Sequence, residues 1–344
     1  MSFVIHPWRG ALTLVGVSLA LFQSAQAQEE AFFKDKTIRV IVGSAPGGGY
    51  DAYARLVSDH MRRHIPGNPQ IVVQNMPGAG SLVATNHIAN VAPKDGTVIG
   101  AINAAMTTQP LLKPDQAKFD PRKMNWIGST LREFHIGLVR ANSPVKVMAD
   151  TQKTEIPVAG TGGSTSTYPV ITNAVLNTKF KVVQGYQGTA EGMLAMERGE
   201  VDGLIGITWA SIKATQAAAL RDGKIQVLAQ FGLRKHPELP NVPLVLDLAK
   251  TPEDEAAMRL VFSSQEVGRP WVVPEGVPAK TVAVLRKAFD DTMADPEFRA
   301  EAAKRKLDLD PTPGAEIQKV VEDIYKTPAK VVERIKPFLE QTAQ

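Results

Sequence analysis

The stretch that decides the fold is Thr37-Ile-Arg-Val-Ile-Val42, followed by Gly47-Gly-Gly49 and by a helical pattern from Asp51 to Ile65. The first segment is rich in β-branched residues, which predicts a buried strand. After the glycines, apolar residues recur on one helical face, and Pro66-Gly67 ends the pattern. A strand, a glycine-rich turn and a helix in this order form the repeating unit of a parallel sheet.

The same alternation continues along the chain. Strand patterns follow at residues 70–74 and 97–102, with a helical pattern over 77–90 between them. The alternation restarts near residue 136, where helical patterns that include one over 168–176 separate five further predicted strands, at residues 136–139, 156–159, 181–184, 204–207 and 225–229. These two series predict an α/β fold with mainly parallel sheets.

The end of the chain suggests how the two series are organised. Residues 279–344 are almost entirely helical in pattern, and a helical tail usually needs a sheet to pack on. We therefore expect the tail to return to the first lobe and the second lobe to be inserted. This predicts two doubly wound lobes, residues 28–135 plus 239–344 and residues 136–238, joined by a hinge of two crossings near residues 135–140 and 231–236.

The first 27 residues predict export. Arg9 is the only formal charge before Glu29, an apolar run covers residues 11–22, and Ser24-Ala-Gln-Ala27 ends in small residues. This pattern is typical of a secretory signal peptide, and we expect cleavage after Ala27 and a periplasmic mature protein. An uncleaved anchor helix is the alternative, but the run is shorter than the roughly 20 residues that span a bilayer.

The composition excludes several classes of site. The formal net charge is +4, without a block of Lys or Arg interleaved with aromatics, so we expect no nucleic-acid partner. The absence of cysteine excludes disulfides, thiolate metal sites and cysteine nucleophiles. His60 and His64 have the spacing of a helical metal pair but lack the Glu of the H-E-x-x-H motif. We favour a solvated polar helix face there over a zinc site.

A nucleotide cofactor is not expected either. Gly47-Gly-Gly49-Tyr-Asp-Ala52 formally fits a dinucleotide-binding motif after a strand. The next predicted strand ends at Gln74-Asn75, without the acidic residue that such a site places on the ribose. We therefore predict that the protein uses no cofactor and no metal.

Three predicted strand-to-helix junctions are unusually rich in Gly, Ser and Thr, and they cover residues 44–51, 75–81 and 159–167. In open parallel sheets, ligands bind at the carboxyl ends of the strands. Glycine lets backbone N–H groups approach a ligand, and a helix N-terminus adds unpaired donors and a partial positive charge. Such junctions predict an anion site, although tight turns alone would also explain them. We expect Asp51 to be structural and to accept backbone N–H groups.

Several motifs along the mature chain occur together in one known family. They are Pro46-Gly-Gly-Gly-Tyr-Asp51 with Ala54-Arg55, then Val73-Gln-Asn-Met-Pro-Gly-Ala-Gly80 and Pro93-Lys-Asp-Gly96. Further matches are Gly185-Tyr-Gln-Gly188, Arg198-Gly-Glu-Val-Asp202, residues 234–243 and Pro274-Glu-Gly-Val-Pro278. With these motifs the sequence resembles the extracytoplasmic receptors of tripartite tricarboxylate transporters, also called Bug proteins.

This resemblance implies a type II periplasmic-binding-protein fold, with the tail packed on lobe one. It also implies ligand carboxylates held by backbone groups of the loops and by bridging waters. By position, the ligand-binding residues of lobe one are Ser44, Pro46, Gly48, Gly49, Tyr50, Gly80, Ser81, Asn103 and Ala104. Those of lobe two are Thr161, Gly163, Ser164, Thr165, Tyr186, Gly188 and Thr208.

The sequence departs from the family pattern at four places. Ser44-Ala45 replaces an aromatic–proline pair, Ser81 replaces a glycine, and Gln187 stands where lysine is common. The stretch 246–265 is longer than usual and lacks an expected tryptophan. These departures affect the identity of the ligand rather than the fold.

Together, the patterns and the family resemblance predict a monomeric periplasmic solute-binding protein that captures a small carboxylate in the interlobe cleft. Its expected partners are the membrane permease subunits of a tripartite tricarboxylate-type transporter. An enzyme would need a titratable pair, or a nucleophile with its base, where the sequence offers backbone donors and hydroxyls. A ligand-sensing receptor for a signalling partner, and an exported enzyme that uses the same cleft, are the alternatives. Dicarboxylates, amino acids and aromatic acids all fit as ligands.

Overall fold

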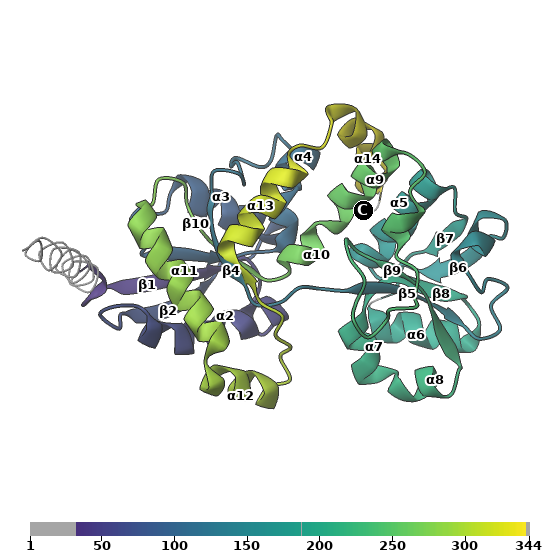
Figure 1. Cartoon of the computed structure of the whole chain (residues 1–344), viewed down its shortest axis with the longest axis horizontal. Helices are drawn as coiled ribbons and strands as arrows, with labels where there is room; N and C mark the ends of the chain where they lie inside the picture. The colour runs from purple at the N-terminus through teal and green to yellow at the C-terminus, as the bar shows by residue number, and fades with distance from the viewer. Residues whose placement is uncertain (1–31, 187, 342–344) are drawn as a thin grey trace, which may run out of the picture. The chain divides into compact units, whose positions relative to one another are not determined.

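The computed structural model describes residues 32–186 and 188–341 (Figure 1). Their contacts form two compact units. Unit 1 contains the described residues up to Asn103, Lys123–Gly128 and Pro270–Leu309, and unit 2 contains Ala104–Arg122, Ser129–Arg269 and the described residues from Asp310 onward. The predicted signal peptide, its cleavage site after Ala27, and Gln187 lie outside the described residues.

Unit 1 is built on a mixed sheet, and the strands that this unit contributes to it run in the order β4-β10-β3-β1-β2. β1 pairs in parallel with both β2 and β3, as predicted, whereas β10 is antiparallel to β3. The strands are β1 (Thr37–Val42), β2 (Gln70–Asn75), β3 (Val98–Ala101), β4 (Asn125–Ser129) and β10 (Pro270–Val273). Because β1, β2 and β3 are parallel neighbours, the three segments that follow them leave the same edge of the sheet.

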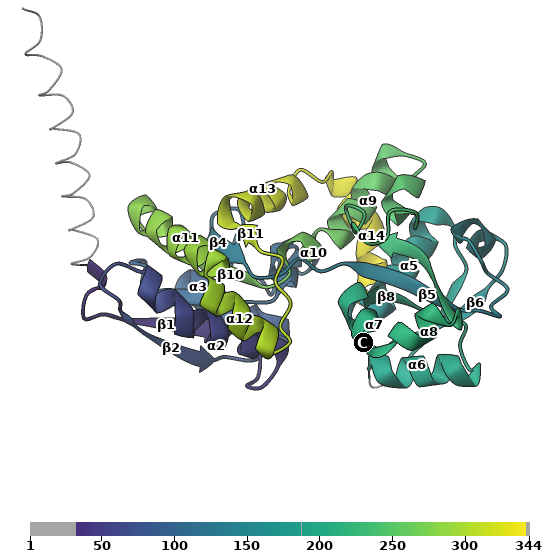
Figure 2. The ribbon, with the colours of Figure 1, turned by 60° about the horizontal axis from the view of Figure 1, so that its bottom comes forward.

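Helices and short 3-10 turns flank this sheet. They are α2 (Gly49–Met61), η1 (Arg62–His64), η2 (Ala79–Ser81), α3 (Leu82–Asn90), α11 (Ala279–Ala294) and α12 (Pro296–Lys304). Both α11 and α12 lie against α2 (Figure 2). The predicted apolar stripe of α2 is buried, with Leu56 and Met61 in one core with Phe289. The first part of the helical tail therefore packs on the first sheet, as predicted.

Unit 2 contains a five-stranded sheet in the order β7-β6-β8-β5-β9. β6 pairs in parallel with β7 and β8, whereas β5 is antiparallel to both β8 and β9. The strands are β5 (His135–Arg140), β6 (Ile156–Ala159), β7 (Phe180–Val183), β8 (Gly203–Thr208) and β9 (Ile225–Phe231). All five predicted strands are confirmed, with boundaries that differ by two residues or fewer.

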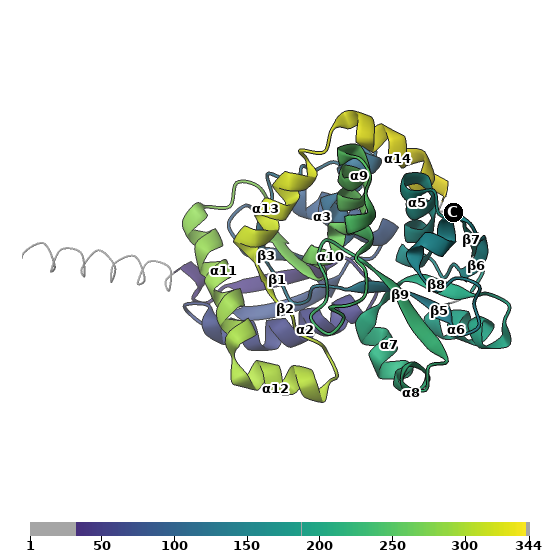
Figure 3. The ribbon, with the colours of Figure 1, turned by 45° about the vertical axis from the view of Figure 1, so that its right-hand side comes forward.

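The helices of unit 2 come from several parts of the sequence. They are η3 (Ala104–Thr107), α4 (Gln109–Leu112), η4 (Met148–Gln152), α5 (Ser164–Leu176), α6 (Thr189–Arg198), α7 (Trp209–Thr215), α8 (Ala217–Arg221), η5 (Val245–Leu248), α9 (Pro252–Phe262), α10 (Ser264–Val267), α13 (Gly314–Ile324) and α14 (Ala329–Gln341), and a two-residue strand β11 (Thr312–Pro313) precedes α13. α14 packs against α5 and α9 (Figure 3). No helix within the described ranges is long and apolar enough to cross a membrane.

The two units divide the chain at other points than the predicted lobes. The last two helices, α13 and α14, and residues 239–269 belong to unit 2 rather than to the unit of the first sheet. The long stretch 246–265 forms most of η5 and α9, and its Met258 and Phe262 are buried in the core of unit 2. The predicted lobes, with the second lobe over residues 136–238, describe which segments would move together, and they stay a prediction.

Candidate functional site

The loop between β1 and α2 is held by the carboxylate of Asp51, a residue that is only 3% exposed. Its Oδ2 accepts hydrogen bonds from the backbone N–H of Gly47 and from Nε of Arg55, both at 2.9 Å. The hydrogen bond from Arg55 and the bonds from Gly47 and Asn75 lower the pKa of Asp51 to about 2, against the effect of burial. Asp51 is therefore ionised at neutral pH and accepts a backbone N–H, as the sequence predicted.

Asn75 joins this loop to the end of β2. Its Nδ2 donates to Oδ1 of Asp51 at 2.9 Å and to the carbonyl oxygen of Ser44 at 3.0 Å. Its Oδ1 accepts from Nη2 of Arg55 at 3.1 Å. Gly47 has a φ of 83°, a left-handed conformation that favours glycine. The glycine-rich loop is thus fixed from both sides before any ligand arrives.

The next amides along the loop are available. Within residues 32–186 and 188–341, no protein acceptor receives the backbone N–H of Gly48 or Gly49. Gly49 is the first residue of α2, which has 13 residues, so its N–H is one of the unpaired donors at a helix start. The positive end of the helix dipole adds to these donors, so this position favours a bound anion.

The turn after β2 approaches the same sheet edge. Gly78 and Gly80 have φ values of 143° and 64°, which the Pro-Gly-Ala-Gly sequence permits. The following residue, Ser81, is buried, and its Oγ donates to the carbonyl oxygen of Gly43 and accepts from the backbone N–H of Asn103. The hydroxyl of this predicted ligand residue is therefore engaged with the protein itself. Unit 1 brings its predicted site residues together on the three segments after β1, β2 and β3.

In unit 2, the loop after β6 leads into a helix that begins earlier than predicted. α5 starts at Ser164 rather than at Tyr168, and Pro169 lies inside it. The Ser and Thr residues of the junction therefore form the first helical turn instead of a loop. Two of them cap the loop behind them, since the Thr161 amide donates to Thr165 Oγ1 at 2.9 Å and the Gly162 amide donates to a hydroxyl of the same turn at 3.2 Å.

Beyond these capped positions the amides are again available. Among the described residues, no protein acceptor receives the backbone N–H of Gly163, Ser164 or Thr165. The hydroxyl of Ser164 donates to the carbonyl oxygen of Gly206 on β8 at 2.7 Å, which holds the start of α5 against the sheet. α5 has 13 residues, so its first turn is a second anion-favouring helix terminus.

The remaining predicted site residues of unit 2 lie at other element ends. Gly188 has a φ of 147° and precedes α6, and Tyr186 packs on the apolar cluster that contains Met193. Thr208 ends β8, and Ala104 begins η3. Their roles toward a ligand stay a prediction.

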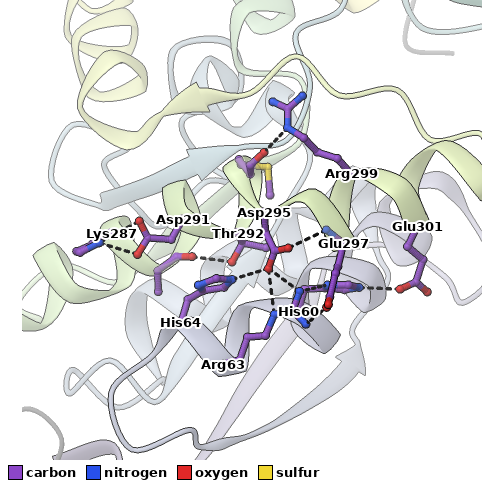
Figure 4. A network of polar contacts seen from close by, with 12 residues as sticks. His60, Arg63, His64, Lys287, Asp291, Thr292, Asp295, Glu297, Arg299 and Glu301 are labelled. Atoms are coloured by element: carbon purple, nitrogen blue, oxygen red, sulfur yellow. Dashed lines mark hydrogen bonds and ion pairs between the residues drawn. The ribbon is translucent and has the colours of Figure 1, made fainter.

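The two histidines of α2 and η1 form a packed polar face (Figure 4). His60 Nε2 lies 2.7 Å from Glu301 Oε2, and His64 Nε2 lies 2.9 Å from Asp295 Oδ2. Burial of Asp295 opposes its ionisation, but hydrogen bonds from Arg63 and His64 outweigh that effect and hold its pKa well below the usual range. The prediction of a solvated face was wrong for His60, which is buried against α12, whereas Arg62 and Arg63 are exposed. The described part of the chain contains no group of three or more acidic or histidine side chains that could hold a metal.

Residues 53–336 match the model of a protein family described as the tripartite tricarboxylate transporter family receptor. This chain belongs to that receptor family. The motif-based resemblance is confirmed, because the match covers most of the chain rather than one loop.

Individual relatives of this receptor agree. A UPF0065 protein encoded in the gbd 5′ region of Cupriavidus necator is 27% identical over 299 residues, which cover 83% of each chain. The structure of a TctC solute-binding protein from Polaromonas matches with a TM-score of 0.68 and 18% identity, over 89% of this chain and 98% of that one. MatC from Rhodopseudomonas palustris, solved with bound malate, matches with a TM-score of 0.54 and 23% identity, over 86% and 98%. The predicted periplasmic solute-binding fold is confirmed.

Sequence reasoning missed part of how the receptor builds its site. In the sequence, Arg55 and Asn75 stand out only as parts of family motifs, whereas in the structure both donate hydrogen bonds to Asp51 and so shape the first loop. The signal was present, since a buried carboxylate in a first helical turn needs donors from neighbouring segments. Sequence reasoning also gave no sign that the Ser81 hydroxyl lies between two strand ends.

Proposed function

We propose that this receptor binds a small carboxylate in the periplasm and delivers it to the membrane permease subunits of a tripartite tricarboxylate-type transporter. The mature protein begins after Ala27 and acts as a monomer. The observation that carries the proposal is the pair of helix starts with unoccupied amides, at Gly48-Gly49 and at Gly163-Ser164-Thr165. Malate bound to the structural neighbour MatC supports a carboxylate as the ligand class.

The available donors are sufficient in number and strength. A hydrogen bond to a charged acceptor contributes about 1.5–3 kcal/mol. Five such bonds, toward the upper end of that range, reach micromolar affinity, about −8 kcal/mol, after the cost of immobilising the ligand. The guanidinium of Arg55 on α2 donates to Asp51 and Asn75, so it fixes the loop instead of pairing with the ligand. Backbone dipoles therefore supply the attraction.

We infer that the protein is a receptor without catalytic activity. Its family is one of solute-binding receptors. The carboxylate beside the unoccupied amides, Asp51, has a pKa lowered to about 2 and accepts three hydrogen bonds. A general base works best with a pKa near the working pH, so Asp51 is poorly suited to that role.

A thermal-shift screen on the mature protein tests the proposal. We expect one or more of malate, succinate, adipate, citrate and glutamate to raise the melting temperature, because a ligand that binds only the native state stabilises it by mass action. Isothermal titration then gives the Kd. Stabilisation by neutral sugars but by none of the acids would contradict the carboxylate proposal.

A further inference from the structure

The ladder between β1 and β3 is interrupted at a defined point. The strands pair in parallel up to Val42 and Ala101, and the backbone N–H of Gly43 still donates to the carbonyl oxygen of Ala101 at 3.0 Å. In a regular parallel ladder, the carbonyl oxygen of Gly43 would next accept from the backbone N–H of Asn103. That bond is replaced by the hydroxyl of Ser81, which donates to Gly43 at 2.9 Å and accepts from Asn103 at 3.0 Å.

The hydroxyl therefore acts as a spacer between two strand ends. Two hydrogen bonds in series stand where one direct bond would close the ladder. Ser81 is only 3% exposed, so bulk water cannot easily hydrogen-bond the Gly43 carbonyl or the Asn103 amide if the hydroxyl is removed. Residues 44–49 begin directly after Gly43, and the segment after Asn103 leaves from the other side of the spacer.

Ser81 lies at a backbone position whose conformation favours glycine. Ser81 has a φ of 87°, a left-handed conformation that costs an L-residue energy and that glycine adopts freely. The side chain also constrains its neighbour, because a Cβ on Gly43 would collide with both Oγ and Cβ of Ser81. A serine is thus present where the backbone alone favours glycine. What the serine adds over a glycine is a hydroxyl with two hydrogen bonds, to Gly43 and from Asn103.

We propose that Ser81 is a positioning residue that holds apart the ends of β1 and β3. It thereby sets the width of the unit 1 half-site, which we define as residues 44–49 together with Asn103. This inference rests on the proposed function of the same site. Ser81 affects ligand binding by setting the separation between residues 44–49 and Asn103, and not by contact with the ligand. Without the hydroxyl, the Asn103 N–H bonds directly to the Gly43 carbonyl, the strands pair by one further step, and the half-site narrows.

The test compares Ser81→Gly and Ser81→Ala with the wild-type mature protein. Each protein is titrated with whichever of malate, succinate, adipate, citrate or glutamate stabilises the wild type most. We expect the Kd to rise at least tenfold in both variants. The melting temperature without ligand separates this effect from a general loss of stability, because Ser81→Gly also removes the left-handed strain and should melt close to the wild type.

A matched control removes another buried hydroxyl of unit 1. Thr292 is fully buried, and its Oγ1 donates to the carbonyl oxygen of Ala288 at 2.6 Å within α11. Thr292→Val keeps the side-chain shape and should leave the Kd within twofold of the wild type. A crystal structure of Ser81→Gly supplies the direct readout, in which the Asn103 nitrogen should lie about 2.9 Å from the Gly43 oxygen.

The outcomes separate this inference from the proposed function. A Ser81→Gly variant with wild-type affinity, or a crystal structure of it in which a water keeps the two strand ends at their original separation, would overturn the positioning role. If the wild type itself bound none of the acids, the proposed function would be wrong, while the crystal structure would still decide whether Ser81 spaces the strands.

Discussion

Removal of one amide proton from the first half-site tests the proposed binding mode most directly. Gly48 has φ −81° and ψ 172°, and proline fixes φ near −65°. Gly48→Pro is therefore compatible with this backbone and deletes one N–H that no described acceptor receives. The matched control is Gly48→Ala, which keeps the N–H and whose Cβ meets nothing closer than the carbonyl oxygen of Ala45, at 3.7 Å.

The expected magnitude follows from the single bond that is lost. A hydrogen bond to a charged acceptor contributes about 1.5–3 kcal/mol, and each 1.4 kcal/mol changes the Kd tenfold. Gly48→Pro should therefore weaken carboxylate binding by about 10- to 150-fold. Gly48→Ala should stay within a few-fold of the wild type.

Isothermal titration with the best carboxylate of the thermal-shift screen measures both variants, and melting temperatures without ligand show whether the fold is kept. Equal affinity of Gly48→Pro and the wild type would refute the role of this amide. Equal weakening in both variants would also refute it, because the loss would then come from the added carbon atoms and not from the missing proton.

Three further predictions concern the framework of the site. Because the pKa of Asp51 is lowered in the folded protein, its ionised form stabilises the native state at pH values above the unfolded-state pKa of 3.8, and this stability is lost as the pH falls toward about 2. Asp51→Asn should therefore flatten that part of the pH profile of urea unfolding and lower the free energy of unfolding by about 2 kcal/mol at pH 7. Gln265 is buried and bonds two backbone groups and the Tyr168 hydroxyl, so Gln265→Ala should lower the free energy of unfolding by about 3 kcal/mol or more, and a loss under 1 kcal/mol would contradict its structural role. Gly206→Ala places a Cβ 2.6 Å from the Ser164 carbonyl oxygen at a φ of 89°, and should cost more than 2 kcal/mol in urea unfolding; a wild-type midpoint would show that α5 can move away from β8.

The strands of this chain could be predicted well because their signal is local. β5 and β9 are mainly apolar segments that each contain an Ile and a Val, and the structure confirms both. β4 was not predicted, since Asn125-Trp-Ile-Gly-Ser129 mixes polar residues and glycine with only two large apolar ones, and it becomes a strand through its neighbours in the sheet. The start of α5 was predicted late because Ser and Thr beside glycine are equally typical of a turn, and only the contacts of the folded chain decide between the two.

For the candidate site, too, the local sequence predicted some features, whereas others depend on contacts of the folded chain. The sequence indicated which loops carry amides for an anion, but not which of those amides the protein uses itself. In each unit, a loop amide is taken by a polar side chain four residues later in the first helical turn, as Gly47 is by Asp51 and Thr161 is by Thr165. The same spacing recurs from Gly162 to Ser166. Among the described residues, the amides of Gly48, Gly49 and residues 163–165 have no such partner. The capping side chains therefore fix each loop in a shape that leaves these later donors without a protein acceptor.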